Sequence, residues 1–262
     1  MEQTDYEYRG LIVSSWDLLR GDTSNWPDRF FYKDVILHSG QPALDVGCGT
    51  GRLLLDYLAS GIDIDGVDNS PEMLALCREK AQKLDLQPTL FQQAMELLNL
   101  PRKYRTIIVP SSSFQLVTNL NDAAEAMKRF LNHLEPGGVV VMPFMILWTG
   151  QATENIITKD WRLVAERIRP NDDVLVRRWT CATYDIANQL EHTEDRYEVI
   201  REGEVIASEY HSRSPATRWY TQEQAIDLFR EASFTNIQLV SGFSQQPVSE
   251  GDTLFSVFGT RP

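Results

Sequence analysis

Apolar residues along the chain form two patterns: short continuous runs, and longer segments in which they recur every three or four positions. Short runs bounded by turn residues are typical of buried strands, and the longer repeats are typical of amphipathic helices. The short runs predict seven strands, within residues 42–47, 62–68, 88–94, 105–110, 139–145, 235–243 and 252–260. The longer repeats predict helices around residues 14–19, 30–37, 52–61, 71–84, 122–134 and 222–232.

Several of these helices have residues at their ends that can satisfy free backbone groups. Ser70 followed by Pro71 is expected to begin a helix, because a serine side chain accepts a backbone N–H and proline fits the first turn. Thr221 and Gln224 have the spacing of a capping box. Gly61 is expected to end a helix, since glycine readily adopts a left-handed conformation.

The regular alternation of strands and helices is interrupted between residues 146 and 218. Segments 172–185, 189–200 and 204–214 predict an antiparallel β meander, and Glu202-Gly203 fits a two-residue turn between the last two. With that loop length, residues whose numbers sum to 405 should face each other. One face would then carry His192, Glu194, Arg196, Glu209, His211 and Arg213, and the other Tyr197, Val199, Ile206 and Tyr210.

The order of the elements predicts an α/β fold with a doubly wound, mostly parallel seven-stranded sheet and an inserted antiparallel β meander. We expect a single domain over residues 1–262, in which residues 146–218 form a β-rich lid or dimerisation subdomain. In such a sheet, ligands bind at the carboxyl ends of the strands, near the point where the strand order reverses.

Composition and charge narrow the partners. The 262 residues carry a formal net charge of −12, which opposes binding to the phosphates of nucleic acid and favours a small-molecule substrate or a protein partner. The three cysteines and four histidines have no metal-site spacing, so no metal is expected. Neither a signal peptide nor an apolar run of about 18 residues is present, so we expect a cytoplasmic protein without a membrane partner.

The stretch PALDVGCGTGRLL, residues 42–54, places glycines at 47, 49 and 51 between a strand and a helix. Glycines there let the backbone approach a ligand at a helix N-terminus. A dinucleotide fingerprint needs a third glycine where this chain has Arg52, which disfavours a nicotinamide-dependent dehydrogenase. Asp68 ends the second strand 21 residues after Gly47 and suits the hydroxyls of a ribose.

Three segments taken together, LDVGCGTG, GVDNSPEML and LEPGGVVVM, resemble the class I S-adenosylmethionine-dependent methyltransferases. The resemblance covers residues 16–147 and 218–260 and implies a Rossmann-like methyltransferase fold with S-adenosyl-L-methionine as cofactor. By position it implies cofactor contacts from Asp45, Gly47, Cys48, Gly49, Gly51, Asp68, Asn69 and Met73. The run FQQAMELLNLP resembles the adenine-contacting segment, which adds Gln93, Ala94 and Met95; an exposed turn is the alternative.

Two further segments resemble ligand-contacting parts of this family. The stretch VPSSSF implies cofactor contacts at Pro110 and Ser111, with Ser112 and Ser113 nearer the substrate; a serine-rich loop without function is the alternative. The stretch SWDLLRGDT is similar to the entry segment of glycine N-methyltransferase-like enzymes. By position it implies Trp16, with Arg29 or Arg20 for the cofactor carboxylate, although Trp16 could instead anchor a docking helix.

The resemblance implies methyl transfer to a nitrogen or oxygen of a small molecule. The alternatives are a non-catalytic S-adenosylmethionine-binding partner and a protein or nucleic-acid methyltransferase. Aromatic residues could line an apolar acceptor pocket, and Phe114, Trp148 and Trp219 are the candidates alongside the serines. No catalytic residue is assigned. The charged face predicted for His192 and His211 is expected to be exposed to solvent, so neither histidine is expected to be a general base. A homodimer through the inserted strands is a further expectation.

Overall fold

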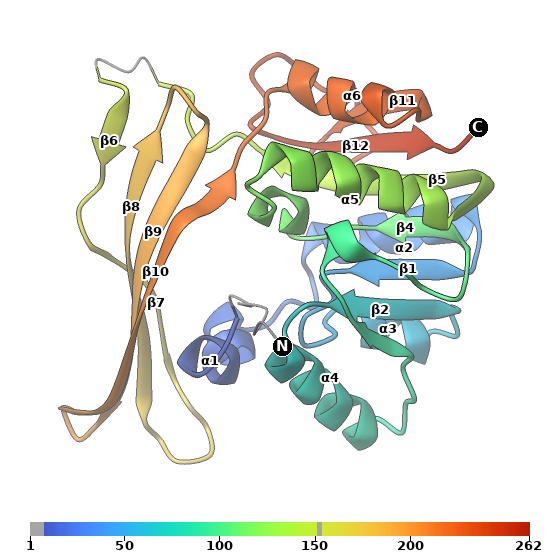
Figure 1. The fold of residues 1–262 in the computed structure, drawn as a ribbon. Helices are drawn as coiled ribbons and strands as arrows, with labels where there is room; N and C mark the ends of the chain where they lie inside the picture. Colours follow the sequence, from blue (N-terminus) through green and yellow to red (C-terminus); the bar gives the residue numbers. More distant parts are fainter. Residues whose placement is uncertain (1–7, 151–153) are drawn as a thin grey trace. The chain divides into compact units, whose positions relative to one another are not determined.

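The computed structural model of the chain describes residues 8–150 and 154–262, and these divide into two compact units (Figure 1). The larger unit consists of Asn25–Leu147 and Trp219–Pro262. The smaller unit consists of the residues up to Ser24 together with Trp148–Arg218. From Trp148 onward, the predicted insertion, residues 146–218, therefore shares its unit with the amino-terminal segment, while its first two residues belong to the larger unit.

The larger unit contains a seven-stranded sheet, as the sequence predicts. Its strand order is β11-β12-β5-β4-β1-β2-β3, with β1 in the interior of the sheet. Neighbours from β5 to β3 are parallel, whereas β12 is antiparallel to both β5 and β11. The bounds are β1 Ala43–Val46, β2 Ile64–Asp68, β3 Leu90–Gln92, β4 Tyr104–Ile108, β5 Leu134–Met145, β11 Thr235–Ser241 and β12 Leu254–Thr260.

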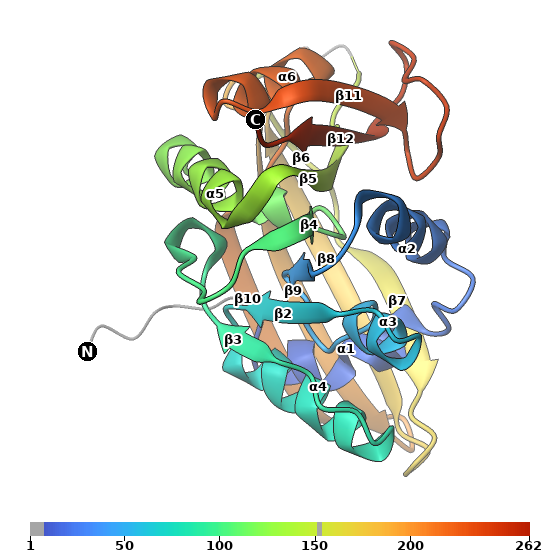
Figure 2. The same ribbon diagram turned by 90° about the vertical axis from the view of Figure 1, so that its right-hand side faces the viewer.

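Helices cover both faces of this sheet (Figure 2). They are α2 Pro27–Ser39, α3 Leu54–Ala59, α4 Pro71–Lys83, α5 Leu120–His133 and α6 Gln222–Glu231, with short 3₁₀ turns at η1 Met95–Leu97 and η2 Ser113–Leu116. One apolar cluster includes α5 and α6, and the other includes α2, α3 and α4. Successive strand residues serve opposite clusters, so Ile107 packs with the first and Ile108 with the second.

The predicted helix caps are present. The Ser70 hydroxyl accepts the Met73 N–H at 3.1 Å, with Pro71 in the first turn of α4. Thr221 and Gln224 form a reciprocal capping box on α6. Gly61, two residues after α3, has φ of +79°. These local signals therefore fix where the helices flanking the sheet begin and end.

The smaller unit holds α1 Leu11–Arg20 and a second, antiparallel sheet. The predicted meander is formed by β8 Leu175–Asp185, β9 Leu190–Arg201 and β10 Glu204–Arg218. The structure adds two strands that the sequence analysis missed, β6 Ile156–Thr158 and β7 Arg162–Ile168, and both pair with β8. Three valines of the sheet pack with Leu11, Leu18 and Leu19 of α1.

The register predicted for β9 and β10 is wrong beyond the turn. Glu204 faces Arg201 and Val205 faces Ile200, which sum to 405 as expected. An irregularity between Val205 and Ala207 then shifts the pairing by one residue, so that Ala207 faces Val199. A β-bulge adds one residue to one strand and reverses which face the later side chains occupy. As a consequence, Glu209, His211 and Arg213 share a face with Tyr197, not with His192.

Candidate functional site

The glycine turn after β1 has the geometry that its sequence indicates. Gly47, Gly49 and Gly51 have φ values of +74°, +54° and +81°, a region that favours glycine. A Cβ at Gly47 would lie 2.7 Å from Ser113 Oγ, and one at Gly51 would lie 2.6 Å from Cys77 Sγ. At Gly49 nothing lies within 4 Å of the added carbon. The middle of the turn is therefore open, while its two ends are packed.

Asp68, at the carboxyl end of β2, stabilises this turn through hydrogen bonds to its backbone. Its Oδ2 accepts the Gly49 N–H at 2.8 Å and its Oδ1 accepts the Ser70 N–H at 2.9 Å. Burial raises the pKa of Asp68, although backbone hydrogen bonds from Ser70, Gly49 and Asn69 act in the opposite direction. A carboxylate has about four lone-pair sites, so Asp68 can still accept a hydrogen bond from a ribose hydroxyl.

Asp45, on the neighbouring strand β1, is a buried acid with capacity for a ligand. It is 1% exposed, and within the described residues its Oδ1 has no hydrogen-bond partner. Burial raises the pKa of Asp45 to about 7, against the lowering effect of Arg52. An unmatched buried carboxylate oxygen is costly unless a donor or a cation reaches it. The ammonium group of a bound amino-acid moiety would meet this need.

The loop after β4 lies against the glycine turn, as the Ser113 contact with the Gly47 position shows. Ser111 and Ser112 have φ of +57° and +58°, which is unusual for residues with a side chain. Ser113 Oγ donates to the Pro110 carbonyl at 2.7 Å. Two consecutive left-handed serines at the carboxyl end of a central strand mark a backbone held in a specific shape, as ligand-binding loops often are.

Gln115 is a positioning residue that the sequence analysis missed. Its Oε1 accepts the Met145 N–H at 2.7 Å, and its Nε2 donates to the Met145 carbonyl at 3.0 Å. The side chain is fully buried, so these bonds tie η2 to the carboxyl end of β5. The only sequence signal was a glutamine between two apolar residues, Phe114 and Leu116.

The segment expected to contact adenine has a different internal arrangement. The Gln93 backbone N–H donates to the Asp68 carbonyl at 3.1 Å, which places the segment beside the acid. The Gln93 amide oxygen, however, accepts the Asn99 N–H at 2.8 Å and thereby closes its own loop. Ala94 caps η1, and Met95 packs against the apolar core. Gln93 keeps one lone pair for a ligand, and its contact with adenine stays a prediction.

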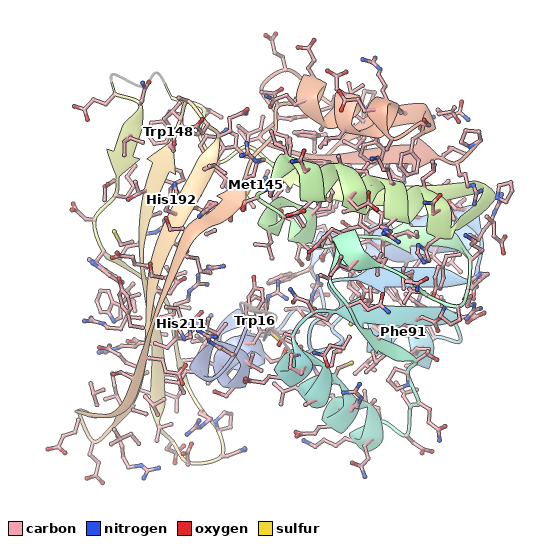
Figure 3. All side chains as sticks on the ribbon, in the orientation of Figure 1. Trp16, Phe91, Met145, Trp148, His192 and His211 are labelled. Atoms are coloured by element: carbon pink, nitrogen blue, oxygen red, sulfur yellow. The ribbon has the colours of Figure 1, made fainter. Side chains whose placement is uncertain are left out.

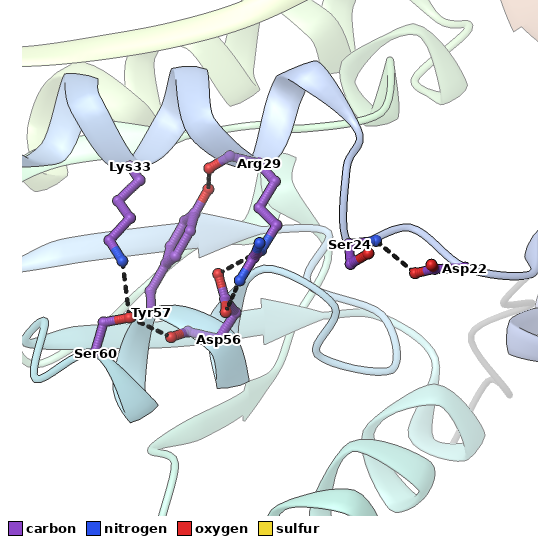
Figure 4. Close-up of polar contacts among 7 residues, drawn as sticks. All are labelled: Asp22, Ser24, Arg29, Lys33, Asp56, Tyr57 and Ser60. Atoms are coloured by element: carbon purple, nitrogen blue, oxygen red, sulfur yellow. Dashed lines mark hydrogen bonds and ion pairs between the residues drawn. The ribbon is translucent and has the colours of Figure 1, made fainter.

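Arg29, expected near the cofactor carboxylate, lies in an ion pair (Figure 4). Its Nε donates to Asp56 Oδ2 at 2.9 Å, and the Tyr57 hydroxyl donates to the Arg29 carbonyl at 2.7 Å. Arg52 is likewise paired with Asp28, at 3.0 Å between Nη1 and Oδ1. The charge of Arg29 is thus neutralised locally, and its role toward the cofactor stays a prediction.

The aromatic candidates have diverse surroundings. Phe114 is fully buried and packs against Phe144 and Tyr220. Trp219 is 4% exposed. In the smaller unit, the Trp148 indole N–H donates to the Gly150 carbonyl at 2.8 Å (Figure 3). The contacts of Phe114, Trp148 and Trp219 with a substrate stay predictions.

Trp16 on α1 carries a cation above its ring. The Arg20 guanidinium carbon lies 4.7 Å from the ring centroid, and the Tyr8 ring stands edge-on at 5.0 Å. Arg20 is one helical turn after Trp16, so this stacking is local to α1. The contact holds the indole in place, and its approach to a cofactor stays a prediction.

The remaining predicted cofactor residues lie around the same strand ends of the larger unit. Cys48 is buried within the turn, Asn69 follows Asp68, and Met73 is buried in the first turn of α4. The site fits a ligand that contains a nucleoside and an amino acid. It combines open space at Gly49, a carboxylate at Asp68 that suits a ribose, and an Asp45 Oδ1 without a hydrogen-bond partner among the described residues. S-Adenosyl-L-methionine has both parts.

Comparison with known proteins agrees with this geometry. Residues 43–138 match the family model described as a methyltransferase domain. A dTDP-3-amino-3,4,6-trideoxy-α-D-glucopyranose N,N-dimethyltransferase from Streptomyces venezuelae is 32% identical over 126 residues, covering 47% of this chain and 52% of that protein. The chain spans about half the length of most of the curated relatives that it matches.

Solved structures extend the similarity of the fold to nearly the whole chain. An S-adenosylmethionine-dependent methyltransferase from Clostridium acetobutylicum has a TM-score of 0.73 at 22% identity, with 94% of this chain and 96% of that chain covered. An S-adenosylmethionine-bound amino pentose methyltransferase from Micromonospora echinaspora has a TM-score of 0.67 at 21% identity, with 99% and 100% covered. Residues 43–138 of this chain therefore match a methyltransferase domain, within a chain that has the fold of S-adenosylmethionine-dependent methyltransferases.

Proposed function

We propose that this protein transfers the methyl group of S-adenosyl-L-methionine to an amine nitrogen of a small molecule. The observation that carries the proposal is the combination of an open Gly49 with Asp45 and Asp68 at adjacent strand ends. Several relatives and structural neighbours are named as N-methyltransferases of amino sugars or of glycine and sarcosine, which supports nitrogen as the attacked atom.

The residues of the larger unit would hold the cofactor in defined parts. Asp68 would accept hydrogen bonds from the ribose hydroxyls of the cofactor. Asp45 would face the ammonium group of its methionine part, and the Gly49 backbone would lie against that same part. The bound cofactor supplies an activated methyl group on a sulfonium ion. The task left to the chain is alignment and exclusion of water, since the methyl donor is already activated.

Methyl transfer to matched acceptors tests the proposal. The protein would be incubated with S-adenosylmethionine and pairs of sugars that differ only in an amino or a hydroxyl group, with glycine and sarcosine as further acceptors. We expect S-adenosylhomocysteine and a methylated amine, detected by mass spectrometry. Transfer to the hydroxyl sugars alone would contradict the choice of nitrogen, and cofactor binding without any transfer would support the non-catalytic alternative.

A second copy of the chain is the partner that we propose for the smaller unit. Support comes from exposed apolar side chains on and beside its strands, among them Trp161, Leu163, Val164 and Tyr210. Light scattering after size exclusion would show a dimer that Tyr210→Glu weakens, and a wild-type monomer at high concentration would contradict it.

Among the described residues, none of the helices has the length and apolarity that a membrane span requires. The cellular location stays a prediction.

A further inference from the structure

A buried ion pair joins the glycine turn of the larger unit to the first turn of α2. Arg52, directly after Gly51, donates from Nη1 to Asp28 Oδ1 at 3.0 Å and from Nη2 to Asp28 Oδ2. The guanidinium carbon of Arg52 also lies 5.1 Å from the centroid of the Trp26 ring. The side chains of Arg52 and Asp28 are 12% and 6% exposed, so this bidentate pair is largely excluded from water.

The charges of this pair act on Asp45, the buried acid of β1. A buried ion pair by itself is weak evidence for a role in stability, because the loss of hydration offsets the attraction between its charges. Burial raises the pKa of Asp45 to about 7, Arg52 acts to lower it, and Asp68 and Asp28 act to raise it. Arg52 therefore favours the ionised form of Asp45, and Asp28 opposes it.

Two buried polar atoms around this pair have no hydrogen-bond partner among the described residues. They are Asp45 Oδ1 and the hydroxyl of Tyr32, which is fully buried one helical turn after Asp28 on α2. Burial raises the pKa of Tyr32, and Asp28, Asp45 and Arg52 all act on it, so the four side chains form one cluster. Buried polar atoms without partners are rare unless a water or a ligand completes them. The cluster therefore suits a polar ligand.

The charges of the cluster leave one negative charge uncompensated when Asp45 is ionised. Asp45 and Asp28 each carry a negative charge, and Arg52 carries one positive charge. Asp68 is held separately by the N–H groups of Gly49 and Ser70. An ammonium group would neutralise the cluster and would bring donors to Asp45 Oδ1, since an ammonium group has only donors to offer. The amino-acid part of the cofactor carries such a group.

We propose that the Asp28–Arg52 pair sets the charge of the site that binds the ammonium group of the cofactor. Arg52 stabilises the Asp45 carboxylate, and Asp28 both holds Arg52 in place and limits that stabilisation. Arg52 and Asp28 are positioning residues that act through Asp45, and neither is required to touch the cofactor. The inference rests on the contact between Asp45 and the ammonium group that belongs to the proposed function.

Other titratable side chains lie around Asp45. Asp68 on β2 is an acid whose pKa is also raised by burial, so the experiment must separate its protonation from that of Asp45. The tyrosines and cysteines stay neutral in the pH range in which Asp45 titrates, because burial raises the pKa of each. They are Tyr32 on α2, Cys48 in the glycine turn, Tyr57 on α3 and Cys77 on α4.

The affinity for S-adenosylhomocysteine, measured by calorimetry at a series of pH values, tests the proposal. Because the ionised form of Asp45 pairs with an ammonium group, the affinity of the wild type should fall as the pH drops through about 7. 5′-Methylthioadenosine has the nucleoside but no amino-acid part, so its affinity should not fall in this way. A fall with both ligands would assign the effect to Asp68 and the ribose, and would contradict the proposal.

Arg52→Gln and Asp28→Asn break the same ion pair but change its charge in opposite directions. Arg52→Gln should move the fall about one pH unit higher, which lowers the affinity for S-adenosylhomocysteine about tenfold at pH 7. Asp28→Asn should move the fall to lower pH, so that the affinity at pH 6 exceeds that of the wild type by about threefold or more. Arg52→Lys keeps the positive charge and should leave the fall near its wild-type position. A purely structural role of the pair would move the first two variants in the same direction.

A second ion pair between the same elements provides the control. Arg29 on α2 donates from Nε to Asp56 Oδ2 on α3 at 2.9 Å (Figure 4). Asp56→Asn should leave the pH of the fall unchanged, because Asp56 is not among the groups that act on Asp45. Urea denaturation would show which variants fold. If Arg52→Gln does not fold, Asp28→Asn and Arg52→Lys still test the proposal through their opposite expectations.

Two kinds of result would overturn the inference, and they are distinguishable. Shifts in the same direction for Arg52→Gln and Asp28→Asn, or no shift in either, would remove the ion pair from cofactor binding while Asp45 keeps its proposed contact. An affinity of the wild type that does not change with pH, together with an unchanged affinity in Asp45→Asn, would place the ammonium group elsewhere. That second result would overturn the proposed contact itself, and this inference with it.

Discussion

His211 lies directly opposite Asp195 in the antiparallel pair of β10 and β9. The carboxylate of Asp195 is almost completely buried between the guanidinium groups of Arg178 and Arg213. Breaking such a pair by removing one partner is costly, because it leaves an uncompensated buried charge. The ion pair therefore keeps β8, β9 and β10 in register and fixes the backbone from which the imidazole projects.

Asp68→Ala should weaken cofactor binding by tenfold to a hundredfold. The ribose would lose a charged acceptor, and hydrogen bonds to charged groups contribute about 1.5–3 kcal/mol. The Gly49 N–H would lose its partner at 2.8 Å as well. Calorimetry with S-adenosylhomocysteine measures the change, with Asp227→Ala, at a half-exposed side chain of α6, as the control. Affinity within about a factor of two of the wild type would show that the ribose lies elsewhere.

Gly49→Val and Gly61→Val separate backbone strain from ligand binding. Both glycines have positive φ, and in both cases nothing lies within 4 Å of an added Cβ. Each variant should therefore lose about 1–2 kcal/mol of unfolding free energy, measured by urea denaturation. Cofactor affinity should fall more than tenfold in Gly49→Val alone, because only that side chain would enter the open middle of the turn. Equal affinities would contradict this placement.

Asp45→Asn should stabilise the ligand-free protein at alkaline pH. Burial raises the pKa of Asp45 to about 7, so the folded state holds a proton that the unfolded state releases near pH 4. The free energy of unfolding of the wild type should consequently fall as the pH rises from about 4 to about 7. Above that pH, the ionised Asp45 should continue to destabilise the folded state. Thermal unfolding at pH 8 should show a higher Tm for Asp45→Asn.

The same variant should bind the cofactor less well at pH 8, because an amide cannot pair with an ammonium group as a carboxylate does. The opposite signs for stability and affinity are the diagnostic result. If Asp45→Asn lowered Tm and left affinity unchanged, Asp45 would be a structural acid without a ligand.

Local signals explain why much of the fold could be predicted. Ser70 and Thr221 cap helices through side chains only three residues from their backbone partners, so spacing in the sequence was sufficient. The glycine turn was equally local, because positive φ at three alternating positions needs glycine. The mostly parallel, doubly wound sheet followed from the alternation of elements, and the resemblance to methyltransferases implied the cofactor.

The sequence analysis was wrong or incomplete where the structure depends on one extra residue or on a partner far away along the chain. One extra residue at the bulge near Ile206 places His211 on the opposite face of the sheet from the predicted one. No local property of that valine–isoleucine–alanine stretch indicates a bulge. Gln115 acts through Met145, 30 residues away. Phe114 was a candidate pocket wall because aromatic residues suit pockets and cores alike, and its packing against Phe144 and Tyr220 involves partners far away in the sequence. Its contact with a substrate stays a prediction.

His133 should make the larger unit sensitive to acid. Its Nε2 accepts the Leu100 N–H at 2.9 Å, and its Nδ1–H donates to the Arg129 carbonyl at 2.7 Å, so both nitrogens are used in the neutral form. Burial lowers the pKa of His133 below its ordinary value, although the bond to Arg129 acts the other way. The unfolded chain therefore binds a proton more readily than the folded one, and stability should be complete above about pH 6.5 and decline below it.

The decline should be visible in urea unfolding at pH 8 and pH 5.5. Protonation would set an N–H of His133 against the Leu100 N–H, and leaving a buried donor unmatched costs about 1–3 kcal/mol. His133→Gln should show a smaller loss between the two pH values than the wild type, since an amide does not titrate. His38→Gln, at an exposed histidine that lies beside the Asp34 carbonyl at 2.7 Å, should keep the wild-type loss. An identical loss in all three proteins would show that other groups cause the acid sensitivity.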